Sequence, residues 1–316
     1  MALSNFAAGF AQGISIRGVP LIQTHPGRAF WVGSAAANVD ASQGIMQGSD
    51  SNKGTFQRPF ATLAYAITQC VAGRGDIIFI KPGHTETVAS AGAITLNKSG
   101  VAVVGLGLGS LRPTFSFTAT ASTITVSGAN TSLKNLLLTG DIDAVVSPIV
   151  VSAADVVLDS LTLRDVTGQM TDGILTTAGA SRLKITRHRH EGDTAAGTNA
   201  AIAIVGGDKI DIDIEYMQGN FAVAGIDVRT TATTNLSVHD VDHFRTHNSV
   251  DLFLKDTITA STGQVGPYIN LRLQDNAANI TEACTGATFV YMQPINIVNL
   301  AGEASMQTNI TASTDA

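Results

Sequence analysis

The stretch that decides the fold runs from residue 124 to residue 138 and reads ITVSGANTSLKNLLL. A short β-branched run is followed by a turn of small and polar residues, and then by a second apolar run. The same pattern recurs as far as Leu254. Successive repeats are anchored at Val126, Val151, Leu175, Ile202, Val228 and Leu252, which lie 25, 24, 27, 26 and 24 residues apart.

A repeat of this length indicates a solenoid or a propeller. Each unit holds two or three short strands with no helical pattern between them, which favours a parallel β-helix over leucine-rich or helical repeats. We therefore predict an all-β protein whose parallel β-helix coils occupy residues 91–275. In this arrangement Val126, Val151, Val228 and Leu252 face inward, in stacks that follow the solenoid axis.

The composition suits such a core and excludes several classes of partner. Hydrophobic residues make up 44% of the 316 residues, but only 5% are aromatic and 14% charged, as expected for a narrow core of stacked strands. The net charge of −6 and the lack of a Lys/Arg run argue against nucleic acid, which requires clustered cations. No run of about twenty apolar residues predicts a membrane span, and the first residues do not resemble a signal peptide.

The cysteines give no sign of a metal centre or a disulfide framework. Cys70 and Cys284 lie far apart and form no metal-ligand spacing. We expect two plain thiols and no cofactor.

The segments that flank the repeat have different patterns. Glycine and proline interrupt every run in residues 1–47, which we interpret as an extended N-terminal arm that docks on another molecule; the alternative is that it folds back along the solenoid. Residues 48–90 are expected to form a loop, a capping helix and the first rung, and residues 276–316 a C-terminal strand and tail.

The capping helix is predicted from its spacing. Pro59 suits a first helical turn and Gly73 a C-terminal stop. The apolar residues at helical spacing between them are Phe60, Leu63, Ile67, Cys70 and Val71. A helix here would cover the open end of the β-helix, whose unpaired strands would otherwise invite aggregation.

Residues 48–88 carry a resemblance to a known group of proteins. Their sequence is GSDSNKGTFQRPFATLAYAITQCVAGRGDIIFIKPGHTETV. It resembles the opening of right-handed parallel β-helix proteins of the pectate-lyase-like group, in which a capping helix leads into a first rung with the pattern GD, apolar strand, PG.

Further motifs resemble a narrower set, the head-associated virion proteins of tailed bacteriophages. These motifs are IRGVP (16–20), FWV (30–32) and VGLGLGSLRPT (104–114). The resemblance is good over residues 10–165 and generic beyond them. It implies a structural virion protein of the capsid decoration (cement) type, without enzymatic activity. Such a protein would be assembled in the host cytoplasm as a homotrimer and bound to the major capsid protein on the capsid surface.

If the protein clamps capsid subunits, the large side chains of the arm are the expected contacts. Interface energy concentrates in a few such anchors, and an arginine can make a bidentate contact with a carboxylate. The candidate contact residues are Phe6, Phe10, Arg17, Phe30 and Trp31.

Polysaccharide cleavage is the main alternative, because two carboxylates on adjacent rungs could reach the separation of about 5 Å used by retaining glycosidases. The polar residues that gather near the ends of the second strands are Asp165, His188, His190, Glu191, Glu215, Tyr216, His239, Asp240, Asp242 and His243. Asp211, Asp213 and Glu215 alternate with isoleucines and should face outward. A solvated face is the simpler interpretation, since no aromatic platform for a sugar accompanies them.

The histidines could suggest a metal site but are better interpreted as polar subunit contacts. They occur in RHRHE (187–191) and at His239, His243 and His247, without an accompanying cysteine. We therefore expect no catalytic, metal or cofactor site. Three hypotheses remain: a capsid decoration protein, a tailspike-like polysaccharide depolymerase, and a receptor-binding β-helix without catalysis.

Overall fold

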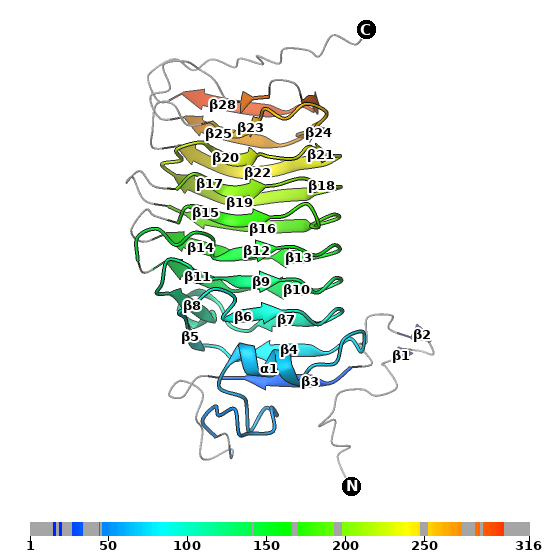
Figure 1. The fold of residues 1–316 in the computed structure, drawn as a ribbon, viewed down its shortest axis with the longest axis vertical. Helices are drawn as coiled ribbons and strands as arrows, with labels where there is room; N and C mark the ends of the chain where they lie inside the picture. Colours follow the sequence, from blue (N-terminus) through cyan, green and yellow to red (C-terminus); the bar gives the residue numbers. More distant parts are fainter. Residues whose placement is uncertain are drawn as a thin grey trace.

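The computed structural model describes residues 15–16, 19–20, 27–33, 44, 46–140, 142–165, 170–192, 198–246, 252–273, 282–284 and 287–299. Over these residues the chain winds into a β-solenoid whose short strands stack coil upon coil, with helix α1 at the N-terminal end (Figure 1). Neighbouring strands of the stack pair in parallel. The predicted parallel β-helix is confirmed.

Each coil places strands on three faces. The first face comprises β3 (Ala29–Val32), β4 (Ile77–Ile80), β7 (Ala102–Gly105), β10 (Ser132–Lys134), β13 (Val157–Asp159), β16 (Lys184–Glu191), β19 (Asp211–Gly219), β22 (Leu236–Thr246), β24 (Thr262–Val265) and β27 (Thr288–Tyr291). The second face comprises β5 (Thr85–Val88), β8 (Thr114–Phe117), β11 (Leu137–Gly140), β14 (Thr162–Asp165), the C-terminal halves of β16, β19 and β22, β25 (Ile269–Leu273) and β28 (Ile295–Asn299).

The third face is a separate 8-stranded sheet. It comprises β6 (Ile94–Leu96), β9 (Ile124–Val126), β12 (Ile149–Val151), β15 (Asp172–Thr176), β17 (Ala200–Ile204), β20 (Ala224–Val228), β23 (Leu254–Asp256) and β26 (Glu282–Ala283). Small elements outside the three faces are β1 (Ser15–Ile16) with β2 (Val19–Pro20), β18 (Gly207–Asp208) with β21 (Thr233–Thr234), and the 3₁₀ turn η2 (Gly109–Leu111).

The corners between the first and second faces are tight from β10 onward, where they use a left-handed backbone. Asn135, Ser160, Arg187 and Asp240 occupy this corner in different coils, and each has a φ between 49° and 56°. Asparagine is the residue other than glycine that adopts this conformation most readily. The Nδ2 of Asn135 also donates hydrogen bonds of 2.9 Å to the carbonyl groups of Gly105 and Gly107, which ties its corner to the coil before.

The inward stack on the third face agrees with most of the predicted anchors. Val126 pairs with Val151, and Val228 continues the same ladder; all three are fully buried. Within this stack each aliphatic side chain packs on the equivalent side chain of the next coil. Such burial is worth about 2 kcal/mol for each valine.

The prediction that Leu252 belongs to this stack is wrong. Asp256 is in register with Val228, and Leu252 lies half-buried ahead of β23. Thr176 follows Val151 in the ladder and Ile204 precedes Val228, so the anchors Leu175 and Ile202 are also out of register. Because coils differ in length, a fixed step from one apolar residue to the next loses the register.

Helix α1 (Leu63–Gln69) covers the first coil, as predicted, but it is shorter than expected. Thr62 is its N-cap and accepts a hydrogen bond from the backbone N–H of Tyr65. A carboxylate oxygen of Glu86, on β5, accepts the N–H of Leu63 at 2.9 Å. These partners start the helix after the predicted Pro59 turn. Val71 lies beyond its end and is 50% exposed.

Part of the predicted N-terminal arm belongs to the solenoid. Strand β3 pairs in parallel with β4, and Phe30 lies in the hydrophobic core at 7% exposure, against Phe60. The prediction of a separate arm over residues 1–47 is therefore wrong for residues 29–32, where the alternative of folding back along the solenoid holds. At the other end, β26, β27 and β28 continue the coils beyond the predicted boundary at residue 275.

Among the described residues, no helix is long and apolar enough to cross a membrane.

The inward stack makes a prediction about stability. Replacing Val151 with Asp buries an unpaired charge between Val126 and Thr176 and should lower the free energy of unfolding by at least about 3 kcal/mol. Val150→Asp, on the outward side of the same strand, should cost much less. Urea unfolding followed by circular dichroism measures both. Equal stability of the Val151→Asp variant and the parent would contradict the assigned register.

Candidate functional site

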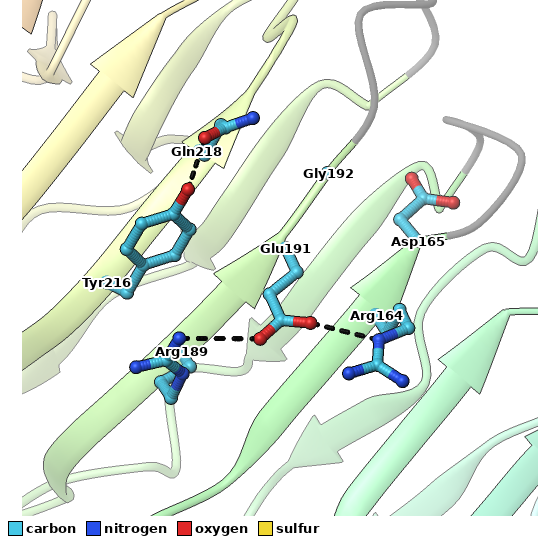
Figure 2. Close-up of a pocket in the computed structure, with 7 residues that line it drawn as sticks. All are labelled: Arg164, Asp165, Arg189, Glu191, Gly192, Tyr216 and Gln218. Carbon is cyan, nitrogen blue, oxygen red and sulfur yellow. Dashed lines mark hydrogen bonds and ion pairs between the residues drawn. The ribbon is translucent and has the colours of Figure 1, made fainter.

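A shallow groove of about 520 Å³ lies where β14, β16 and β19 end on the second face. Its lining residues are Arg164, Asp165, Arg189, Glu191, Gly192, Tyr216 and Gln218 (Figure 2). Strand register explains the gathering, because Arg164, Glu191 and Gln218 occupy the same place in three consecutive coils.

The carboxylate at the centre of the groove is already neutralised. One oxygen of Glu191 lies 2.9 Å from Arg164 Nε, and the other lies 3.5 Å from Arg189 Nη2 (Figure 2). Arg189 also binds Glu215 in the following coil at 2.8 Å. A carboxylate whose two oxygens are each held by a guanidinium group is poorly placed to attack a substrate.

Tyr216 does not offer a free ring face to a sugar. The guanidinium of Arg189, from the coil before, lies 5.1 Å from the ring centroid. The imidazole of His243, from the coil after, stacks in parallel at 4.8 Å. The hydroxyl donates to Gln218. Arginine and histidine therefore take the two positions from which a pyranose ring would stack.

Asp165, the second carboxylate of the groove, is buried and accepts hydrogen bonds from nearby groups of the protein. Its Oδ2 accepts hydrogen bonds from the N–H of Met170 and from the hydroxyl of Thr198, both at 2.9 Å. The groove thus contains two carboxylates from adjacent coils, as the depolymerase hypothesis requires, but both are engaged within the protein.

Ion pairs between coils continue onto the first face. Asp159 binds Lys134 in the coil before and Arg187 in the coil after. Burial alone would raise the pKa of Asp159, but hydrogen bonds from Arg187, Lys134 and Ser160 lower it to about 2. Charges of opposite sign in successive coils therefore stabilise the stack.

The carboxylates predicted to face outward on one strand do so. Ile212 and Ile214 are fully buried, while the side chain of Asp211 is 33% and that of Glu215 46% exposed. Asp211 binds Lys184 at 3.3 Å and His239 at 2.8 Å. Asp211 and Glu215 form part of the ion pairs between coils, and only Asp213 forms no ion pair with a described residue.

His188 and His190 point into the core, which contradicts their predicted role as polar surface contacts. Both are fully buried, and within the described residues none of their ring nitrogens has a hydrogen-bond partner. Burial lowers the pKa of His188 to about 3 and that of His190 to about 4. His190 takes the place that Leu163 and Met217 take in the adjacent coils, so both histidines fill apolar positions.

The histidines and carboxylates do not assemble into a metal site within the described part of the chain. His239 is held between Asp211 and Asp240, and His243 stacks on Tyr216. His247 lies outside the described residues.

The candidate capsid contacts fall into three groups. Phe6, Phe10 and Arg17 lie outside the described residues. Phe30 is part of the core, so it is not available as an anchor. Trp31 remains half-buried on the outer surface of β3.

Trp31 belongs to a group of aromatic residues that the sequence did not reveal. Its ring lies 4.9 Å from that of Phe56 and 5.0 Å from that of Phe79. The ammonium of Lys81 lies 4.3 Å from the centroid of Phe56, which is 47% exposed. We call Trp31, Phe56, Phe79 and Lys81 the N-terminal aromatic cluster. The alternating pattern of residues 77–80 places Phe79 on the outward side of its strand, and this was the sequence signal that could have revealed the cluster.

Comparisons of the chain with protein-family models, curated proteins and solved structures find no match.

The buried histidines predict how stability depends on pH. Their folded pKa values lie below the value of about 6.5 expected in the unfolded chain, so the unfolded state binds more protons as the pH falls. Stability is therefore fully present above pH 6.5 or so and is lost as the pH drops toward 4.

Replacing both histidines with leucine should remove this loss. The variant His188→Leu/His190→Leu should exceed the parent in stability by more at pH 5 than at pH 8. Urea unfolding at the two pH values tests this. A pH dependence unchanged by the double substitution would contradict the assignment of both imidazoles to the core.

Proposed function

We propose that this chain is a structural bacteriophage virion protein that decorates the capsid. In this proposal it binds the major capsid protein on the outer surface of the head, as a homotrimer, and it is not an enzyme. The observation that carries the proposal is the pairing of outer-face charges within the protein. Arg164, Glu191, Arg189 and Glu215 form one continuous network across three coils.

This pairing suits a structural protein better than a catalyst. A catalytic acid or nucleophile must change its charge or its bonding during turnover. In the groove, such a change would break contacts that hold one coil to the next. A stiff column with internally satisfied charges, by contrast, is suited to reinforcing a shell.

The N-terminal aromatic cluster is the anchoring surface in this proposal. Its residues lie on β3, in the loop before α1 and at β4, at the N-terminal end of the solenoid (Figure 1). Phe56, an exposed aromatic residue beside the Lys81 ammonium, is typical of an interface anchor.

The depolymerase hypothesis is the second candidate, and one observation favours it. Asp165 and Glu191 bring carboxylates from adjacent coils to one groove. Their engagement with Met170, Thr198 and two arginines argues against it. A receptor-binding β-helix without catalysis is a weaker third candidate, since the groove could also accept a ligand without acting on it.

Capsid binding gives a direct test. Deleting residues 1–26 spares β3 and its core residue Phe30, so the solenoid should remain folded. The deletion should nevertheless abolish binding to capsids that lack the protein. In the full chain, Phe56→Ala should weaken capsid binding by about tenfold or more, as removal of an interface anchor does. Co-sedimentation with purified capsids measures both.

Substitutions in the charged face provide the control. Asp213→Asn/Glu215→Gln should leave capsid binding unchanged, and Glu191→Gln should give no change in polysaccharide cleavage because none is expected. The proposal would be wrong if the deletion variant and Phe56→Ala bound capsids normally while the parent, but not Glu191→Gln, cleaved a host polysaccharide.

A further inference from the structure

The middle coils follow a simple rule for positive charge. Among the described residues from 134 to 229, every lysine and arginine lies within 3.8 Å of a carboxylate oxygen. Most of these pairs join one coil to the next. The positive charges on the outer surface of this region are therefore neutralised by carboxylates of the same chain.

Arg245 and Arg272, which follow this region, are not paired in this way. They are in register on β22 and β25, in adjacent coils, and neither forms an ion pair within the part of the chain that the structure describes. Adjacent coils are about 4.8 Å apart, a spacing at which like charges repel. The Nε of Arg245 is buried without a hydrogen-bond partner among the described residues. Burial, together with the charges of Arg272 and Arg245, lowers the pKa of His243 beside them. We call Arg245 and Arg272 the basic pair.

A complementary negative group lies close by, at the corner where the first face meets the second. It consists of Asp213 in β19 and Asp240 and Asp242 in β22. Burial raises the pKa of Asp213, and the charges of Asp240 and Asp242 add to this effect. Asp242 is exposed and forms no ion pair with the described residues, while Asp240 binds only His239. We call Asp240 and Asp242 the acidic edge.

The two groups lie at the same height on the solenoid. Asp242 and Arg245 are three residues apart in one strand, which corresponds to about 10 Å. The basic pair comes from two consecutive coils, and the acidic edge lies in the first of these coils, with Asp213 in the coil before it.

We propose that the basic pair of one copy binds the acidic edge of a second copy, with the two solenoid axes parallel. In a cyclic assembly of parallel solenoids, the acidic edge of one copy lies at the height of Arg245 in its neighbour, and pairing the two groups reduces the like-charge repulsion within each. A ring closes because every copy presents both halves of the contact. This inference deepens the homotrimer element of the proposed function and names the surfaces that form it.

A second copy fits better than a saccharide or a free anion. The chain itself carries the complementary charges at the required height, whereas a saccharide would find the ring of Tyr216 already covered by Arg189 and His243. An isolated anion would compensate the basic pair but leave the acidic edge unpaired.

Charge reversal followed by charge exchange tests the contact. Light scattering of the parent at low micromolar concentration should give three times the 32.7 kDa mass of the chain. Arg245→Glu/Arg272→Glu should dissociate it, and so should Asp240→Lys/Asp242→Lys. Combining all four substitutions restores opposite charges across the contact and should restore the parent mass. The control Lys53→Glu/Arg58→Glu changes the net charge equally, on an exposed loop, and should leave the mass unchanged.

The outcomes separate this inference from the proposed function. Circular dichroism establishes that each variant is folded, and the mass of the parent should also fall in 1 M salt, which screens such pairs. A monomeric parent, an assembled Arg245→Glu/Arg272→Glu variant, or a folded fourfold variant that stays monomeric would each overturn the inference. So would binding of a uronic-acid polysaccharide to the basic pair of a monomer. Capsid binding by a monomeric parent would leave the decoration role intact, whereas a trimer that fails to bind capsids would contradict that role alone.

Discussion

The parallel pairing of each strand with its equivalent in the next coil is the constraint on which the rest of the structure depends. Because the ladders are largely in register, each side chain has the corresponding residue of the coils before and after as its nearest neighbours. Apolar residues then pack in columns inside, and charged residues meet in columns outside. Core, corners and charge pairs all follow from this repetition.

The same constraint makes charge a collective property of the outer faces. A cation in one coil is stabilised when the neighbouring coil places a carboxylate beside it. Asp159, for example, lies between Lys134 in the coil before and Arg187 in the coil after. Where the alternation fails, as at Arg245 and Arg272, compensation has to come from outside the column. Surface regions whose charges are paired within the chain can therefore be distinguished from regions whose unpaired charges are suited to a partner.

The sequence predicted the architecture but not the local register. The repeat identified the parallel β-helix and the capping helix because both depend on patterns spread over many residues. It failed at Leu252, whose place belongs to the buried Asp256, and at His188 and His190, which fill apolar positions. Polarity alone could not place these residues inside. Phe30 was likewise misplaced because a four-residue strand gives too short a pattern to distinguish an arm from a first rung. In the groove, the sequence identified Asp165, Glu191 and Tyr216, but it gave no sign of the arginine pairing that occupies them.

The difference between the connections has a consequence for how such a chain can vary in length. Only two residues separate β10 from β11 and β13 from β14, and their corners require a left-handed backbone. The connections from the second face to the third differ in length from coil to coil. An extra residue in the tight corner has to be absorbed by a local register shift, as at Asp240 between β19 and β22, whereas one in the longer connections leaves the ladders aligned. As homologous chains diverge, insertions and deletions should therefore accumulate in the connections from the second face to the third. Elsewhere, residues should be gained or lost in whole coils.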